Sequence, residues 1–148
     1  MFKAIPLAAA VLALAGCAVG TGPNGGALST DMQAKVSYQA AYEAAMAQAQ
    51  RCLLGQGGYR LDGKLDQGSA LVRVLAPMSD SEMTRVEIKS SGPDSAAVHI
   101  NMWGRSIWNR DALRAMKEAV TFGVPSCVSY MPGDPKPSEE VWTLPRPR

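Results

Sequence analysis

The sequence lacks the residue patterns that most metal and cofactor sites require. It has one histidine, His99, and no Cys-x-x-Cys pair, so a zinc site built on histidine and cysteine ligands is not expected. It also lacks the Gly-x-Ser-x-Gly motif of hydrolases, a phosphate-binding loop, and a dinucleotide-binding fingerprint, whose glycines must follow a strand and open a helix. The sequence therefore predicts a protein without a metal or a cofactor.

Candidate catalytic side chains are equally scarce. Any triad of serine or cysteine with histidine would have to use His99, which strand alternation places on the face opposite Val98 and Ile100, as is typical of a solvated strand histidine. An enzymatic role would need polar residues converging on this histidine. Glycan cleavage would need a pair of carboxylates, and the candidate pairs all have solvated positions: Asp62 and Asp66 flank a predicted hairpin, Asp80 and Glu82 lie in a connection, and Glu139 and Glu140 lie in the C-terminal tail. The sequence therefore predicts a non-catalytic protein.

The charged residues form no run of one sign. Fifteen lysines and arginines are mixed along the chain with thirteen aspartates and glutamates, which gives a formal net charge of +2. A protein that binds nucleic acid, or binds a membrane through charge alone, needs a basic patch or stripe. We therefore expect no nucleic-acid partner.

The N-terminus combines three features in a fixed order. A short basic start at residues 1–3 precedes the apolar run 4–14, and the run ends in Leu14-Ala15-Gly16-Cys17. The apolar run is too short to span a bilayer. The pattern resembles the signal peptide and lipobox of bacterial lipoproteins. The alternative is an ordinary cleaved signal peptide followed by a cysteine that carries no lipid.

The resemblance implies a covalent lipid as membrane anchor. Residues 1–16 would be the signal peptide, and Cys17 would become the lipidated first residue, carrying a diacylglyceryl group on its thiol and an acyl group on its amine. Such a set of acyl chains holds a protein on a bilayer without help from charge. Ala18, in place of aspartate, resembles the pattern of lipoproteins sent to the outer membrane. We expect an anchor on the periplasmic face of the outer membrane, with the inner membrane as the alternative.

Two cysteines remain once Cys17 is assigned to the lipid. Cys52 and Cys127 form an even pair in a compartment outside the reducing cytosol, which favours a disulfide. The bond would close a loop of about 75 residues and contribute about 4 kcal/mol in the chain-entropy model. The alternative is two separate buried thiols.

Composition divides the mature chain into three parts. Residues 17–29 are rich in glycine and predict a flexible tether behind the lipid. Residues 30–130 have the size and apolar content of a single domain. Residues 131–148 contain repeated prolines and few apolar residues, so they predict an extended tail.

Helical patterns bracket the domain. The first helix is predicted to be capped by Ser29 or Thr30 and to extend to Leu54, because its residues form helices readily and apolar side chains recur three and four apart. The second helix is predicted to begin after a cap at Asn109 and to end at Gly123.

Alternating patterns between the helices predict strands at 59–65, 70–75, 84–89 and 97–103. The predicted fold is α+β, a two-layer sandwich in which a four-stranded antiparallel meander is flanked by an N-terminal and a C-terminal helix. This element order loosely resembles small α+β modules of envelope lipoproteins. Because element order alone carries no site, no functional residue follows from it.

The remaining candidates are aromatic residues and an arginine. Trp103, Arg105 and Trp108 lie between the last strand and the second helix, and Trp142 lies in the tail. Tryptophan and arginine dominate interface hot spots, so these four residues are candidates for binding a protein partner. The alternative is that Trp103 and Trp108 cover the core. The predicted function is a non-catalytic, lipid-anchored accessory or binding protein of the envelope, with a small-molecule or glycan binding module as the alternative.

Overall fold

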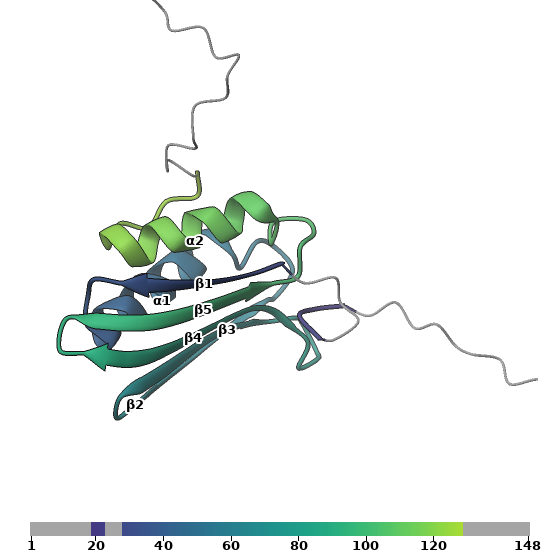
Figure 1. The fold of residues 1–148 in the computed structure, drawn as a ribbon. Helices are drawn as coiled ribbons and strands as arrows, with labels where there is room; N and C mark the ends of the chain where they lie inside the picture. The colour runs from purple at the N-terminus through teal and green to yellow at the C-terminus, as the bar shows by residue number, and fades with distance from the viewer. Residues whose placement is uncertain (1–18, 23–27, 129–148) are drawn as a thin grey trace, which may run out of the picture.

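The computed structural model describes residues 19–22 and 28–128, which form a five-stranded sheet and two helices (Figure 1). In chain order the elements are β1 (Leu28–Ala34), α1 (Tyr38–Cys52), β2 (Arg60–Asp66), β3 (Ser69–Leu75), β4 (Glu82–Gly92), β5 (Ser95–Met102) and α2 (Arg110–Phe122). All neighbouring strands are antiparallel, in the order β1-β5-β4-β3-β2. The predicted α+β class is confirmed.

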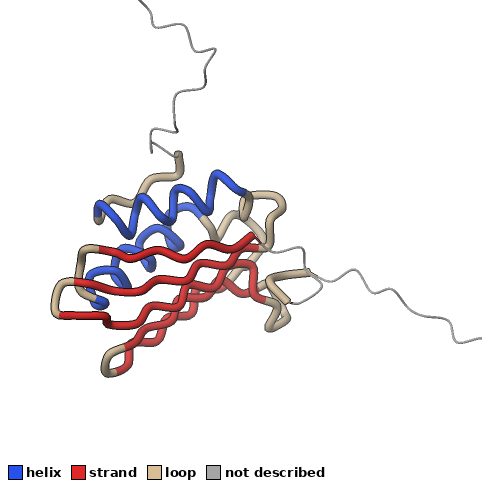
Figure 2. The backbone as a smooth tube through the Cα atoms, in the orientation of Figure 1, coloured by secondary structure: helices blue, strands red, loops and turns tan. Residues whose placement is uncertain are grey.

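Both helices pack on the same face of the sheet, and the core lies between the two layers (Figure 2). Alternate residues of the central strands point into it, among them Val72, Val86 and Ile100, none of which is exposed to solvent. The sheet-facing side of α1 is made largely of alanines such as Ala41 and Ala45, whose small side chains let the helix approach the strands closely.

The fifth strand corrects the predicted fold. Residues 28–34 do not begin a helix: they pair with β5 along their whole length, from Leu28 opposite Met102 to Ala34 opposite Ala96. The segment alternates partly buried and exposed residues with period two, and this pattern, together with pairing to β5, outweighs the helical propensity of its methionine, glutamine and alanine. The helix instead begins at Tyr38.

Capping residues mark where both helices begin and where α2 ends. Ser37, rather than Ser29 or Thr30, caps α1, and its Oγ accepts a hydrogen bond from the amide of Ala40. The predicted cap of α2 is confirmed, since Asn109 Oδ1 accepts from the amides at positions 111 and 112, and Gly123 ends the helix with a left-handed φ of 71°. The predicted antiparallel meander is also confirmed, and it runs from β2 to β5.

Residues 19–22 lie against the start of β4, where they are drawn in purple in Figure 1. The amide of Thr21 donates a hydrogen bond of 2.7 Å to the carbonyl of Glu82. Gly20 is buried there with a φ of +105°. The predicted tether 17–29 is therefore interrupted: part of it contacts the domain, and its last two residues belong to β1.

The disulfide joins Cys52 to Cys127, whose Cα atoms are 5.1 Å apart. It ties the segment after α2 to the end of α1, as the sequence predicts. A buried amide supports the same contact: Gln48 Nε2 donates to the carbonyl of Ser126 at 2.7 Å, and Gln48 Oε1 accepts from the amide of Ser126 at 2.8 Å. The Gln48 side chain thus makes the same pair of hydrogen bonds to the backbone of Ser126 that a residue on a neighbouring strand would make.

No helix within the described residues is both long enough and apolar enough to cross a membrane. The predicted tail, 131–148, lies outside the described residues, and so does the predicted signal peptide.

Replacing both bridging cysteines, Cys52→Ser with Cys127→Ser, should lower the free energy of unfolding by about 4 kcal/mol, because the open chain gains the entropy of a loop of about 75 residues. Urea unfolding followed by circular dichroism measures this change. The control is wild-type protein with a reductant, which should match the double variant. Equal stability of oxidised wild type and double variant would contradict the disulfide's role.

Candidate functional site

Trp108, a predicted partner-binding residue, belongs to the core. It is 2% exposed, and its Nε1 donates a hydrogen bond of 3.1 Å to the carbonyl of Leu53. Its ring centroid lies 4.7 Å from that of Tyr59 and 6.0 Å from that of Trp103, at tilted angles typical of aromatic packing. The prediction that Trp108 binds a partner is therefore wrong. Its burial agrees with the alternative that this tryptophan covers the core.

The other residues of that set do not gather into one surface. Trp103 is partly buried and packs against the core, while Arg105 is exposed in the loop between β5 and α2. Trp142 and the predicted lipidation site, Cys17, lie outside the described residues. The loop therefore does not present two tryptophans and an arginine to a partner.

The sheet face opposite the helices is another candidate surface, because no helix of the described residues lies on it (Figure 2). We call it the open face and define it by the outward residues of three rows that cross β2, β3, β4, β5 and β1 in turn. These rows are Asp62, Arg73, Arg85, Asn101 and Ser29; Lys64, Leu71, Glu87, His99 and Asp31; and Asp66, Ser69, Lys89, Ala97 and Gln33.

Two arginines stand directly opposite each other in the first row. Arg73 and Arg85 are paired across β3 and β4, where two like charges would normally destabilise the sheet. Glu82 removes this conflict, because its Oε1 accepts from Nη1 of Arg73 at 3.2 Å and from Nη1 of Arg85 at 2.9 Å. Asp62 and Glu87 bind the outer sides of the two guanidinium groups. The result is one continuous chain of alternating charges.

This network holds both guanidinium groups in their charged form. The side-chain hydrogen bond to Asp62 is the main cause of a raised pKa for Arg73, and the hydrogen bond to Glu87 has the same effect on the pKa of Arg85. A base whose pKa is raised in the folded state contributes its stability in full at every pH below its ordinary pKa, which for arginine lies far above neutral. The charge pattern at this end of the open face is therefore constant at neutral pH.

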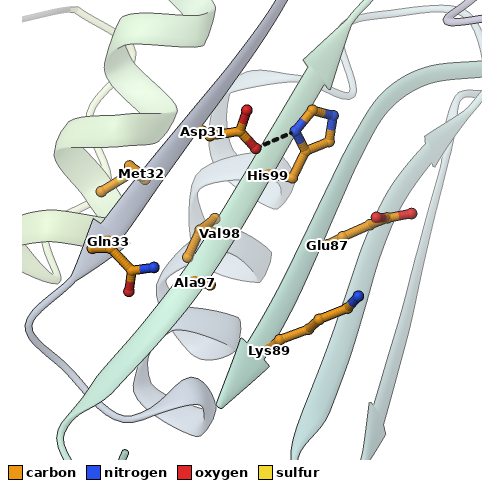
Figure 3. A pocket seen from close by; sticks show the side chains of 8 residues that line it. All are labelled: Asp31, Met32, Gln33, Glu87, Lys89, Ala97, Val98 and His99. Atoms are coloured by element: carbon orange, nitrogen blue, oxygen red, sulfur yellow. Dashed lines mark hydrogen bonds and ion pairs between the residues drawn. The ribbon is translucent and has the colours of Figure 1, made fainter. Parts of the chain in front are cut away.

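A depression of about 480 Å³ lies at the β1 side of the open face (Figure 3). The methyl group of Ala97 leaves space between Gln33 on β1 and Lys89 on β4, while His99 and Glu87 stand one row further along. Asp31, Met32 and Val98 complete the lining, and the side chains of the last two turn toward the helix layer (Figure 3).

His99 has a partner within this depression. Its Nδ1 lies 2.7 Å from Oδ1 of Asp31, so the contact joins β5 to the edge strand β1. Glu87 faces the histidine from the other side in the strand register. The predicted strand histidine is therefore placed on the outward face, as expected, but polar groups do converge on it.

The depression can bind by charge and hydrogen bonding. Its lining offers two carboxylates, one ammonium group, one imidazole and one amide. None of the lining residues is a serine, threonine or cysteine, so this histidine and aspartate have no adjacent nucleophile of the hydroxyl or thiol kind. Within residues 19–22 and 28–128, no three His, Cys, Asp or Glu side chains are grouped so that they could hold a metal ion.

Three side-chain polar atoms of the described residues are buried without a hydrogen-bond partner, and none of them lines the depression. These atoms are Thr84 Oγ1, Asn101 Oδ1 and Trp103 Nε1. The space between the sheet and the helices is filled by fully buried side chains, and the depression lies on the other side of the sheet.

Sequence reasoning locates the residues of this face only in part. Alternation in 84–89 and 97–103 places Arg85, Glu87 and His99 on outward positions. It does not reveal which of them are neighbours, because that depends on strand order and register. Asp31 and Gln33 are missed outright, since composition places their segment in a helix. The alternation of residues 28–34 is the signal that could have found them.

Replacing Glu82 by glutamine should lower the free energy of unfolding by about 1 kcal/mol, because Arg73 and Arg85 then face each other without a shared anion. The matched control is Glu87→Gln, which leaves Glu82 between the arginines and should cost less. Urea unfolding at low and at high salt measures the free energy of unfolding of both variants. High salt should reduce the difference between the two variants, because it screens the repulsion between the arginines. An equal cost for the two variants would argue against the bridging role.

Comparisons with known proteins do not place this chain in a group. No protein-family model matches it, and no curated protein matches it either. Its function must therefore be inferred from its own residues and their geometry.

Proposed function

We propose that this chain is a non-catalytic, lipid-anchored lipoprotein of the bacterial envelope, held on the periplasmic face of the outer membrane, whose domain binds another envelope component. The lipobox residues Leu14 to Cys17 and the apolar run before them support the anchor. The disulfide between Cys52 and Cys127 supports an oxidising compartment. Cys17 carries the lipid, and the domain requires no cofactor.

The open face is the observation that carries the binding role. Its five strands and the seven-residue length of β3 give a surface about 20 Å across and about 23 Å long, which is a little over half of one side of a protein interface of standard size. The arginine and glutamate network fixes side chains that would otherwise lose conformational freedom on binding. Charges held in a fixed pattern contribute more to the specificity of binding than to its affinity.

The partner is expected to present charges complementary to the depression. Lys89 offers a cation, and Asp31 and Glu87 offer anions on either side of His99. Leu71 provides an apolar contact in the middle of the same face, in the row of Glu87 and His99. A folded envelope protein with a surface of alternating charge fits this arrangement best.

A small-molecule or glycan ligand is the second candidate. The volume of the depression, about 480 Å³, lies within the range of small-ligand sites. Its lining of carboxylates, amide, ammonium and imidazole suits a polar ligand with many hydroxyl groups. A ligand of this kind would occupy the space above Ala97.

Cys17→Ala should release the full chain from the membrane. With no thiol to acylate, the protein should move to the soluble periplasmic fraction, and intact mass should lack the acyl groups. The control is Cys52→Ser with Cys127→Ser, which keeps Cys17 and should stay in the outer-membrane fraction. A wild-type protein without acyl mass would contradict the anchor, and acylated protein in the inner membrane would contradict the location.

A photo-reactive amino acid in place of Ala97 in the lipidated chain should form one reproducible adduct in living cells. The same amino acid in place of Ala47, an exposed alanine on α1, is the control and should give none. The charge reversal Lys89→Glu should abolish the adduct at position 97, because it changes the sign of the nearest charge. A protein adduct supports the accessory role, a glycan adduct supports the alternative, and adducts at both 97 and 47 would contradict the open face as the binding site.

A further inference from the structure

The path of the chain limits how far the domain can stand from its lipid. Val19 is two residues after Cys17, and Gly20 is three residues after it. An extended chain spans at most about 3.6 Å per residue, so Gly20 lies within about 11 Å of the Cα atom of Cys17. The headgroup region on each side of a bilayer is itself several ångströms thick. Whatever part of the domain holds Gly20 must therefore lie at the headgroup surface.

Gly20 is fixed to one end of the sheet. A Cβ atom at this position would lie 2.7 Å from the carbonyl oxygen of Glu82, and the backbone φ of +105° is one that side chains rarely adopt. The hydrogen bond from Thr21 to Glu82 holds the next residue. Val19 shares a shallow hollow with Asp80 and Ser81 of the loop between β3 and β4. Residues 19–22, which follow Cys17 closely in the sequence, are thus held beside this loop (Figure 1).

The loop between β3 and β4 exposes an apolar side chain at this same end. Met78 is fully exposed, and it also has a positive φ of 56°, a conformation that glycine adopts without strain. A glycine would relieve the backbone and remove an exposed apolar group, yet the chain has methionine. Val19, next to the loop, is 49% exposed. Two apolar side chains therefore project where the lipid is attached.

A cation accompanies these apolar groups. Arg60, at the start of β2, donates a hydrogen bond of 2.9 Å to the carbonyl of Ser79 and so supports the loop that carries Met78. Its side chain is 55% exposed, with Asp80 as an exposed partner at 3.6 Å. Long arginine side chains place their charge at headgroup level while their stems contact apolar surface.

We propose that this end of the domain, formed by residues 19–22, Arg60 and the loop 76–81, rests on the lipid surface with Met78 inserted among the headgroups. We call it the membrane-facing end. The proposal depends on the lipid at Cys17 that is proposed above. It implies that the strands rise from the membrane, with the turns at 67–68 and 93–94 furthest from it and the open face turned sideways, free to meet a partner.

The test uses full-length, lipidated protein carrying a diazirine amino acid at position 78, reconstituted in vesicles of phosphatidylethanolamine and phosphatidylglycerol. After illumination, lipid adducts are counted by mass spectrometry. The control position is Leu65, which is 48% exposed but lies at the opposite end of β2. We expect about five-fold more lipid adduct at position 78 than at 65, because the two ends of a seven-residue strand are about 20 Å apart.

A pair of glycine variants tests whether the docked segment sets this geometry. Gly20→Ala should detach residues 19–22 and lower the adduct at position 78 about three-fold, because a longer free tether lowers the effective concentration of the loop at the membrane. Gly22→Ala is the matched control, since a Cβ there meets nothing within 4 Å, and it should leave the adduct unchanged. Both variants should unfold at the wild-type urea midpoint.

The outcomes separate the two proposals. Intact mass measured before illumination reports acylation of Cys17, and an unacylated chain would overturn both the anchor and the membrane-facing end. An acylated chain with equal adducts at positions 78 and 65, or with none at 78, would overturn the membrane-facing end and leave the anchor standing. Loss of adduct in both glycine variants, or in neither, would overturn the role of the docked segment.

Discussion

Pairing of β1 with β5 is the interaction on which the rest of the structure depends. It adds an edge strand to the meander and places Asp31 beside His99. Because β1 and β2 occupy opposite edges of the sheet, the chain between them must cross the whole sheet, and α1 makes that crossing. Helix α2 then covers the β1 side of the same face. Both helices cover one face of the sheet, and the opposite face carries the Asp31 and His99 pair that this strand pairing creates.

The two faces of the sheet are stabilised in different ways. The buried face relies on close packing of valines, isoleucines and methionines against an alanine-rich helix, so its stability comes mainly from apolar burial. The open face relies on Glu82, which lets two arginines stand opposite each other on neighbouring strands. Surface ion pairs contribute little individually, but a shared anion between two fixed cations avoids a repulsion that the strand register would otherwise impose. Stability and a fixed charge pattern thus arise from the same side chains.

The sequence is sufficient to predict the helices and strands that depend on residues close together in the chain. Period-two alternation identifies the strands of the meander, and Asn109 and Gly123 mark the ends of α2 because caps act within one turn. The disulfide partners follow from counting cysteines, and the structure joins the same two residues. The prediction for residues 28–34 is wrong because their composition favours a helix while their pairing with β5 involves residues about seventy positions away. Such long-range pairing cannot be read from local propensity.

The candidate site is harder to predict for the same reason. Trp108 has the character of an interface residue because tryptophan is large and polar at one end, but a carbonyl on a distant segment, Leu53, satisfies its N–H and lets it enter the core. The depression arises where a small residue, Ala97, has longer neighbours on both adjacent strands. Neither fact is visible without the register.

The chain that precedes β1 links the fold to its proposed location. If the tether were free along residues 17–29, the lipid would constrain only distance, and the domain could turn any face toward the bilayer. Contact between Gly20 and Glu82 limits any free tether behind the proposed lipid to the residues before Gly20. A short attachment at one end of the strands constrains orientation as well as distance, because the attachment point and the exposed Met78 lie at the same end. In that orientation the lipid surface does not compete with a partner for the open face. The two proposals therefore assign anchoring to one end of the strands and binding to the β1 side of the open face.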